Sequence, residues 1–441
     1  MEVNARVSQG PADEIDVSER TERAFMKRLV LKFGGTSVAN LERIAHVAEI
    51  VEARHKECQA LAVVVSAMSG ATNQLVEWAK GAAGPDLHGA GYDDEYDVVV
   101  ASGEQVTAGL LALALRKRGL KARSWLGWQL KLRTDEAHGK ARITGCDNPE
   151  FLKAVDSGEI AVVAGFQGVD DHGRVSTLGR GGSDTSAVAV AAALQAGLCD
   201  IYTDVDGVYT TDPRITPKAR RLAKISYEEM LELASLGAKV LQTRSVELAM
   251  NHRVPVRVLS SFEGAVSRPN TGTLVCDEEQ IVEKQVVSGV AYSRDEAKFT
   301  LIGVEDHPGV AAIIFGELAD AGVNVDMIVQ ASAKTDGRQN IVFTAPDRDA
   351  PHAQAVLEKA RAKIGYEQLT VGRDVAKVSV IGVGMRSHAG VAKTMFQALS
   401  AKGINIQVIS TSEIKISVLI DANYTELAVR ALHTAYGLDA D

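Results

Sequence analysis

The segment LVLKFGGTS, from Leu29 to Ser37, sets the architecture that we expect for this chain. Residues typical of a buried strand lead into two glycines, and a Thr-Ser pair follows where a helix is expected to begin. Such a loop presents backbone N–H groups at the end of a sheet, and Lys32 adds a cation, so the segment is suited to bind an anion. An ordinary strand-to-helix turn with a surface lysine has the same pattern, and this segment alone does not separate the two.

Size and composition indicate a globular protein of two or three domains. The chain has 441 residues, and single cores stop growing at about 250 to 300 residues. Its net charge of -9 and its lack of a like-charge run give no basic face for nucleic acid. We also expect no membrane segment, because the N-terminus is polar and no apolar run approaches the length that spans a bilayer.

The cysteines lie far apart and show no CxxC spacing, which argues against a zinc site and against a disulfide framework. A reducing compartment is therefore expected, and the cytoplasm is the predicted location. The cysteines are Cys58, Cys146, Cys199 and Cys276.

Strand and helix patterns alternate from Leu29 to Ser260. Residues 1–25 are polar, show no apolar period and are expected to form a loose tail. Apolar strands separated by helical segments predict an α/β domain whose mostly parallel sheet is covered on both faces. The predicted strands are LVLKF, ALAVVVSA, DVVVAS, EIAVVAGFQG, DIYTDV and VPVRVLS, and the predicted helices are Asn40 to Arg54, Thr72 to Lys80, Glu104 to Arg118 and Asp184 to Ala196.

The C-terminal part of the chain contains a repeat. A turn-rich bridge, SFEGAVSRPNTGTLV, follows Ser260, and Phe299 to Gln330 then resembles Val378 to Ser410, with Gly309 matching Gly390. Each copy reads as a strand, a turn, a helix and two further strands, and two copies are too few for a solenoid. We expect a pair of small α+β modules packed against each other.

Two predicted strands end in segments rich in hydroxyl groups or charge. VVVSAMSGATNQL places Ser66 at a strand end and Thr72 near the next helix start, where a threonine is also a common N-cap. VVVASGEQV places Glu104 in the first turn of a predicted helix. A carboxylate is electrostatically favoured there without any function, and it is also well placed to bind an ammonium group.

The segment TLGRGGSDTSA, from Thr177 to Ala187, is the hardest to explain as structure alone. Its three glycines cost backbone entropy, and a glycine loop that opens a helix is a site for an anion. Arg180 adds a planar fork suited to a carboxylate or a phosphate. Further along, TDVDGVYTTDPR carries Asp204 and Asp206, for which a solvated turn is the simpler alternative, and SLGAKVLQTRSVELA carries Lys239.

Taken in order, these motifs resemble the aspartate kinases of the amino-acid kinase superfamily. The matching segments are KFGGTS, SAMSGAT, ASGE, TLGRGGSDTSA, YTDVDGVYTTDPR and GAKVLQTRSVE, and the two repeats resemble ACT modules. The paired modules separate this family from the uridylate, acetylglutamate and glutamate kinases. The resemblance begins at Met26 and implies a monofunctional enzyme with a flexible tail at 1–25, a three-layer kinase domain at 26–262, a linker at 263–297 and ferredoxin-like ACT modules at 298–372 and 373–441.

The resemblance implies transfer of the γ-phosphoryl group of ATP to the β-carboxylate of L-aspartate. This nucleophile is already an anion, so the site must supply alignment and charge stabilisation rather than a strong base. Lys32 and Asp184 match the catalytic positions, and Mg²⁺ is implied as the counter-ion of the nucleotide without a dedicated metal site. The substrate-binding positions are Thr72, Glu104 for the α-amino group, Arg180 for a carboxylate, and Ser183. The ATP-binding positions are Lys32, Phe33, Gly34, Gly35, Ser66, Thr203, Asp204, Tyr209, Thr210, Thr211, Asp212, Pro213, Arg214, Lys239 and Val240.

ACT modules bind small amino acids where paired modules meet, so lysine, threonine or both are the implied effectors. A homo-oligomer, either a dimer or a dimer of dimers, is implied through the same modules. The positions that match an effector site are Asp306, Gly309, Val310, Ala311, Asn324, Val325, Asp326 and Gln330 in the first copy and Asn405, Ile406, Thr411, Ser412 and Glu413 in the second. For Thr411 to Glu413 an ordinary polar strand end remains an alternative.

Three other functions are compatible with parts of the sequence. A related kinase with another acceptor would share the nucleotide motifs, and a non-catalytic amino-acid sensor would share the fold. The presence of Lys32, Glu104, Arg180 and Asp184 together argues against the sensor. Nicotinamide binding at Gly382 to Met385 is set aside, because the third glycine of that motif is missing.

Overall fold

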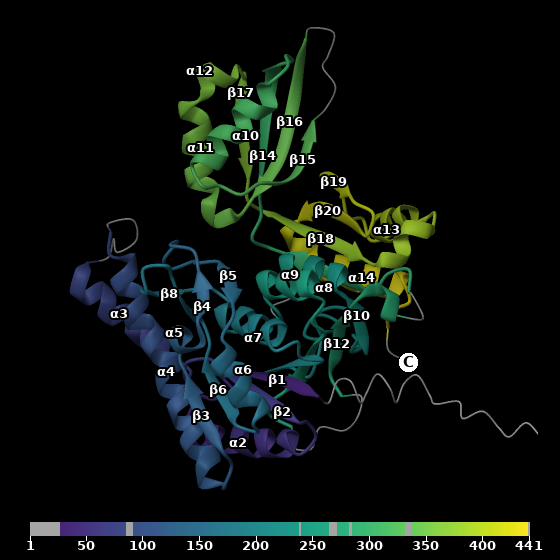
Figure 1. Cartoon of the computed structure of the whole chain (residues 1–441). Helices are drawn as coiled ribbons and strands as arrows, with labels where there is room; N and C mark the ends of the chain where they lie inside the picture. Colours follow the sequence, from purple (N-terminus) through teal and green to yellow (C-terminus); the bar gives the residue numbers. More distant parts are fainter. Residues whose placement is uncertain are drawn as a thin grey trace, which may run out of the picture. The chain divides into compact units, whose positions relative to one another are not determined.

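The computed structural model describes residues 27–84, 91–237, 240–263, 271–281, 285–330 and 337–439 (Figure 1). The predicted tail at 1–25 lies outside these ranges. The chain divides into two compact units, the first formed by Met1–Asp204 with Asn251–Pro269 and the second by Val205–Met250 with Asn270–Asp441.

The first unit is built on a parallel sheet with β1 (Arg28–Phe33) near its centre. β1 pairs with β2 on one side and β9 on the other, so the strand before the glycine loop is among the most buried. All six residues of β2 are buried, and because successive side chains point to opposite faces, both faces of the sheet are covered. The order is β11 (Val256–Ser260), β9 (Leu198–Thr203), β1, β2 (Ala60–Val65), β6 (Ile160–Ala164) and β3 (Ala122–Trp125).

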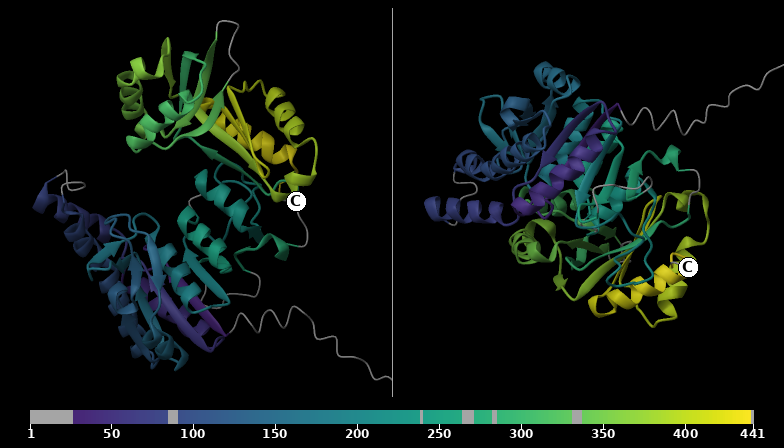
Figure 2. Two further views of the ribbon diagram at one scale, coloured as in Figure 1. Left: turned by 45° about the horizontal axis from the view of Figure 1, so that its top comes forward. Right: turned by 90° about the horizontal axis from the view of Figure 1, so that it is seen from below.

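Helices flank this sheet, as Figures 1 and 2 show. α4 contacts β2, β3 and β6, whereas α7 contacts β1, β2 and β9. The predicted α/β class is therefore confirmed. The helices of this part are α2 (Leu41–His55), α3 (Ala71–Ala83), α4 (Asp93–Lys117), α5 (Gly127–Leu130), α6 (Pro149–Asp156) and α7 (Gly182–Ala193). Most of α9 (Thr243–His252) belongs to the second unit, which it leaves after Met250.

The predicted strand DVVVAS is wrong, because these residues lie inside the 25-residue helix α4. A short apolar run rich in β-branched residues has no period that separates a strand from a buried helix. In α4, Val100 and Ala101 are fully buried while Val98 is 41% exposed, as helical spacing requires. Glu104 consequently lies in the middle of a helix and not in its first turn, so the helix-terminus explanation for this carboxylate fails.

Within the described residues, α4 is the one helix long and apolar enough to cross a bilayer by length and composition. Half of the most apolar stretch of this helix is buried inside the protein, as in the core helix of a globular domain.

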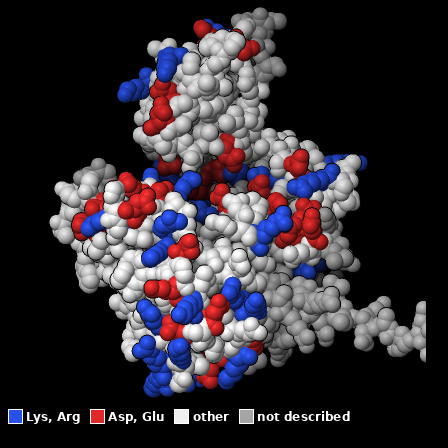
Figure 3. All heavy atoms as spheres, in the orientation of Figure 1, with Lys and Arg blue, Asp and Glu red and all other residues white. Residues whose placement is uncertain are grey.

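On the face drawn in Figure 3, acidic and basic side chains are interspersed.

A small four-stranded sheet, which the sequence did not predict, belongs to the first unit. Its order is β5 (Ile143–Cys146), β4 (Leu132–Thr134), β7 (Gln167–Val169) and β8 (Val175–Thr177). β8 contacts α4 and ends directly before the glycine-rich segment that opens α7.

The second unit contains the two repeats, each as an antiparallel four-stranded sheet with helices. Gly309 and Gly390, matched in the sequence, both precede a helix in a left-handed conformation, with φ of 96° and 99°. The first sheet is β15 (Asp326–Gln330), β16 (Arg338–Ala345), β14 (Ala297–Glu305) and β17 (Gln368–Gly372), with α10 (Val310–Asp320), α11 (Ala350–Lys359) and α12 (Arg361–Ile364). The second sheet is β13 (Gly289–Ser293), β18 (Val375–Ile381), β20 (Lys415–Asp421) and β19 (Val408–Thr411), with α13 (Val391–Ser400) and α14 (Thr425–Ala435). The unit also holds the parallel pair β10 (Lys224–Ser226) and β12 (Thr273–Cys276), α8 (Tyr227–Ser235), and the 3-10 helices η1 (Glu278–Gln280), η2 (Asp347–Asp349), η3 (Val383–Ser387) and η4 (Ala422–Tyr424).

The two repeats pack against each other, as the sequence led us to expect. Met327 of the first repeat shares a small apolar cluster with Val408 and Leu419 of the second. The segment 263–297, expected to be a linker, contains β12 and β13, and β13 completes the second sheet by pairing with β18. The domain limits given above remain a prediction.

A buried ion cluster fixes β9 to β11 in the first unit. Asp200 is fully buried and accepts two hydrogen bonds of 2.8 Å from Arg257 and one of 3.1 Å from Arg54. If this carboxylate were removed, Arg257 would lose its counter-charge and Arg54 would keep only its contact with Glu57.

Asp200→Asn should lower the free energy of unfolding by about 3 kcal/mol, because it leaves the Arg257 charge uncompensated and Arg54 with Glu57 as its remaining partner. Urea unfolding measures this loss. The control is Asp156→Asn, which removes an exposed partner of Arg28 and should cost less than about 1 kcal/mol. Equal losses in the two variants would contradict the role of the buried cluster.

Candidate active site

A pocket of about 570 Å³ lies in the first unit, at the carboxyl ends of the central strands. β1 ends at Phe33 and β2 at Val65, and the residues that follow each of them line the pocket, as ligand sites do in open α/β sheets. The predicted residues that the structure brings together here are Lys32, Gly35, Ser66, Thr72, Glu104, Arg180, Ser183 and Asp184.

Lys32 and Asp184 form an ion pair of 2.5 Å inside the pocket. Lys32 is the penultimate residue of β1, and Asp184 belongs to the first turn of α7. Both side chains are largely buried, so their charges act on a neighbouring ligand with little screening by water. The N-terminus of α7 adds the partial positive charge of a helix start beside this pair.

The glycines of the pocket are needed for close contacts. A Cβ on Gly35 would lie 3.0 Å from the carbonyl oxygen of Ala67, and one on Gly182 would lie 2.8 Å from the ring of Phe166. A Cβ on Gly103 would lie 2.8 Å from that of Ala67. Gly103 therefore lets α4 approach the end of β2, which brings the next residue, Glu104, into the pocket.

Glu104 is buried, with 3% of its surface exposed, and only one of its carboxylate oxygens has a partner. Oε1 accepts a hydrogen bond of 2.9 Å from the backbone N–H of Ala67, while Oε2 has none. Burial raises the pKa of Glu104 to about 7, although the Ala67 N–H opposes this shift by stabilising the charged form. A buried carboxylate oxygen without a partner is the kind of group that a cationic ligand satisfies.

Thr72 is the second residue of α3, whose N-cap is Gly70, so the alternative of Thr72 as an N-cap is wrong. Gly70, Thr72 and Asn73 all line the pocket, which places the start of a second helix at the site.

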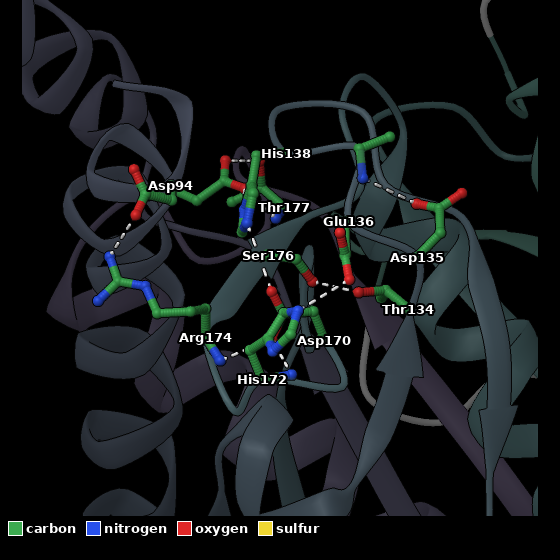
Figure 4. A network of polar contacts seen from close by, with 12 residues as sticks. Asp94, Thr134, Asp135, Glu136, His138, Asp170, His172, Arg174, Ser176 and Thr177 are labelled. Atoms are coloured by element: carbon green, nitrogen blue, oxygen red, sulfur yellow. Dashed lines mark hydrogen bonds and ion pairs between the residues drawn. The ribbon is translucent and has the colours of Figure 1, made fainter. Parts of the chain in front are cut away.

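Sequence reasoning missed Asp97, which shapes one wall of the pocket from within α4. Asp97 is fully buried and accepts hydrogen bonds from His138 Nδ1 at 2.9 Å and from the backbone N–H groups of Gly139 at 3.0 Å and Thr177 at 2.8 Å. Gly139 and Thr177 both line the pocket. Figure 4 shows His138 and Thr177 from this network, with His138 Nε2 3.5 Å from Asp170. One feature of the sequence could have indicated Asp97, because it lies seven residues before Glu104 and this spacing places both carboxylates on the same face of a helix.

Phe166 is a second pocket residue that sequence reasoning missed. It follows β6 with φ of 67°, an uncommon conformation for a bulky side chain, and its N–H donates to Ser186 Oγ at 3.0 Å. Its ring packs over Gly182, which supports the start of α7.

The predicted ATP-binding residues fall in both compact units. Thr203 is the last residue of β9 in the first unit and Asp204 follows it, and the Thr203 hydroxyl donates to Asp204 at 3.0 Å. The stretch from Tyr209 to Arg214 belongs to the second unit, where Arg214 pairs with Asp212 at 2.8 Å. Lys239 lies outside the described residues, whereas Val240 is described and half-buried.

The predicted effector residues form a second polar cluster, at the start of α10 and along β15. Gln339, which sequence reasoning missed, is 2% exposed and donates to Asp306 at 3.2 Å. It also accepts a hydrogen bond of 2.6 Å from Gln330. Asn324, two residues before β15, is exposed. In the second repeat, Asn405 and the stretch 411–413 are exposed, and Ile406 is half-buried.

Asp326 is paired with Lys377 of the second repeat, at 2.8 Å. Lys377 is buried and also contacts Glu296 at 2.6 Å. Burial acts to raise the pKa of Asp326, but the hydrogen bond and charge of Lys377 outweigh it and the pKa is lowered. An effector cation at Asp326 would therefore compete with a lysine that the protein already supplies.

Comparison with known proteins identifies the family. The amino acid kinase family model matches residues 27–260, and ACT domain models match 299–365 and 378–436. An aspartate kinase of Pseudomonas putida is 53% identical over 416 residues, which is 94% of this chain and 98% of the relative. The chain belongs to the aspartate kinase family. An aspartokinase of Mycobacterium tuberculosis is 45% identical over 418 residues, covering 94% of this chain and 97% of that one.

Solved aspartate kinases have the same fold over nearly the whole chain. E. coli aspartokinase III in complex with aspartate and ADP, in its R-state, has a TM-score of 0.75 and 27% identity, covering 93% of this chain and 99% of that one. The same enzyme with lysine and aspartate, in its T-state, has a TM-score of 0.73 and 28% identity, covering 92% and 98%. The resemblance drawn from the motifs is thus confirmed, as is the fold class, and the protein is an aspartate kinase with two ACT domains. The roles of individual residues remain predictions.

Proposed function

We propose that this aspartate kinase transfers the γ-phosphoryl group of ATP to the β-carboxylate of L-aspartate, in the cytoplasm, as the first step of lysine, threonine and methionine biosynthesis. The observation that carries the proposal is the pocket in which a buried lysine-aspartate pair faces a buried glutamate with one unpartnered oxygen. These groups suit an amino acid with an anionic acceptor. The complex of E. coli aspartokinase III with aspartate and ADP supports this choice of substrates.

L-Aspartate is bound by its charged ends. Its α-ammonium group lies against the free Oε2 of Glu104, which replaces the missing hydrogen bond of that carboxylate. Arg180 binds a carboxylate of the substrate, and the hydroxyls of Thr72 and Ser183 complete the contacts. One buried anion and one cationic fork fix the orientation of the substrate and leave its β-carboxylate for the transfer.

Lys32 stabilises the negative charge that spreads over the transferring oxygens, and the backbone at Gly34 and Gly35 lets the phosphates approach closely. The nucleophile is an anion before the reaction, so no residue need remove a proton. Asp184 holds Lys32 in place and offers a carboxylate toward the cations of the nucleotide.

ATP is bound by Ser66, Thr203, Asp204, the stretch from Tyr209 to Arg214 and the segment at Lys239 and Val240. The described residues include no cluster of three or more His, Cys, Asp or Glu side chains that could hold a metal. Mg²⁺ would enter as the counter-ion of the nucleotide, held mainly by phosphate and water with Asp184 as the neighbouring carboxylate, and it would neutralise phosphate charge.

Amino-acid effectors bind at the ACT modules, and lysine, threonine or both act there. The residues are those of the cluster at Asp306, Asn324, Asp326 and Gln330, with a contribution from the second repeat. A symmetric dimer, or a dimer of dimers, forms through these modules. The lysine complex of E. coli aspartokinase III supports an amino-acid effector.

Lys32→Ala and Asp184→Ala should each lower kcat by about a hundredfold or more, because each acts on charge in the transition state. Aspartate-dependent ADP release measures kcat, and an exposed lysine replaced in Lys80→Ala is the control. Near-normal turnover in either pocket variant would contradict the role assigned to that residue. For the wild-type protein, ADP release with another acidic amino acid but not with aspartate would contradict the proposed substrate.

The KM for aspartate should rise as the pH falls below about 7, by up to about tenfold per pH unit, because protonated Glu104 cannot bind an ammonium ion. The direction of this change in KM follows from the raised pKa of Glu104, because the free site takes up a proton on acidification. Glu104→Gln should bind aspartate more weakly, with a KM that is nearly constant between about pH 5.5 and 8. Because His138 is retained in that variant, a pH dependence that survives the substitution would assign the effect to another group.

Asp326→Asn should weaken inhibition by the effector by about five- to 150-fold, because it removes a charge from the proposed effector site. The uninhibited rate should change little, since Asp326 does not line the pocket. Inhibition curves with lysine, with threonine and with both measure this. Glu317→Gln, which breaks an exposed contact to Lys363 in the same module, is the control and should keep full sensitivity. Full sensitivity in the Asp326 variant would count against the site.

A further inference from the structure

His433 on α14 of the second ACT module is fully buried and contacts the stretch from Tyr209 to Arg214. Its Nε2 lies 2.8 Å from Thr210 Oγ1, and its Nδ1 lies 2.8 Å from Asp439 Oδ1. Thr210 is itself fully buried. All of these residues belong to the second compact unit.

The other contacts of Thr210 fix the direction of this hydrogen-bond chain. Thr210 Oγ1 accepts the backbone N–H of Arg220 at 3.1 Å, so its own proton is available for His433 Nε2. Nδ1 of His433 then carries the ring proton and donates it to Asp439, whose pKa is lowered chiefly by this hydrogen bond. Both ring nitrogens are used, and the imidazole is held in one tautomer.

Three segments of the chain contact Thr210, and His433 is the one that does so through its side chain. The backbone of Thr210 also accepts the N–H of Val290 at 2.7 Å and donates to Arg220 at 3.0 Å. Those backbone bonds persist whatever side chain occupies 433. The imidazole is the side-chain partner of the Thr210 hydroxyl, which also accepts the Arg220 N–H, at the centre of the stretch that we assign to ATP.

We propose that His433 is a positioning residue for nucleotide binding, which places the Tyr209 to Arg214 stretch through Thr210. This inference rests on the proposed ATP role of that stretch. A residue of the second ACT module thereby has a function in substrate binding. We expect this function to affect ATP and not aspartate. The aspartate pocket is lined by residues of the other compact unit.

Two substitutions at 433 separate the contact with Thr210 from the contact with Asp439. His433→Asn places an amide where Nδ1 lies and does not reach Thr210, whereas His433→Gln places an amide oxygen where Nε2 lies and can accept from the hydroxyl. The Kd for ATP, measured by calorimetry, should rise about three- to tenfold in His433→Asn and much less in His433→Gln. The KM for ATP should follow, and the KM for aspartate should stay within about twofold of wild type.

Two control substitutions leave Thr210 untouched: one removes a packing contact, and the other breaks an ion pair. Leu432→Ala empties a core position of α14, and Glu232→Gln breaks the 2.7 Å contact between Lys415 and α8. Both should keep the wild-type Kd for ATP, although Leu432→Ala loses thermal stability. Thr210→Val, which also removes the acceptor of the Arg220 N–H, should raise the Kd for ATP at least as much as His433→Asn, and adding His433→Asn to it should cause no further loss. If His433→Asn does not fold, Thr210→Val and Thr210→Ser provide the same comparison.

A Kd for ATP within twofold of wild type in folded His433→Asn or Thr210→Val would overturn the inference. So would an equal rise in the KM for aspartate, or an equal loss of ATP affinity in Leu432→Ala. Failure of the proposed function looks different, because the wild-type protein would then show no aspartate-dependent ADP release.

Discussion

A carboxylate buried in the middle of a long helix is the constraint on which the site depends. Glu104 satisfies one oxygen with the N–H of Ala67 and leaves the other without a partner. This arrangement exists because Gly103 lets α4 pass within contact distance of the end of β2. An unpaired buried carboxylate oxygen destabilises the free protein by about 1–3 kcal/mol, and a bound ammonium group removes that cost. The folded state thus holds a site whose unsatisfied group is complementary to an amino acid.

The same helix also holds one wall of the pocket. Asp97, two turns before Glu104, binds the backbone of Gly139 and Thr177, and Thr177 leads into the glycine segment with Arg180 and Asp184. Glu104 and this wall of the pocket are therefore held by one helix. In the second compact unit, the stretch assigned to ATP is held by the second repeat through backbone bonds and a buried imidazole. The residues proposed for aspartate lie in the first unit, whereas those proposed for ATP are divided between the two.

Local sequence patterns predicted several residues of the pocket. They did not predict contacts between residues that are far apart in the sequence. Lys32 and Arg180 were predicted from glycine-rich segments suited to an anion, Thr72 and Asp184 were predicted through the family resemblance, and the pocket brings all four together. The strand DVVVAS was wrong because three adjacent valines have no diagnostic period, and Glu104 was assigned to a helix start for the same reason. Asp97 and Gln339 were missed because their partners lie far away in the sequence. The pairing of β13 with β18, across more than 80 residues, left no local signal either.

The most direct test of this account is the number of protons exchanged when L-aspartate binds. Calorimetry at about pH 6.5 in buffers of different ionisation enthalpy gives that number. Because the pKa of Glu104 lies at about 7 in the free protein and an ammonium partner lowers it, binding should release between about half a proton and one proton per site, and Glu104→Gln should release none. Binding of aspartate to the wild-type protein without proton release, or with equal release in Glu104→Gln, would contradict the claim that this carboxylate receives the substrate.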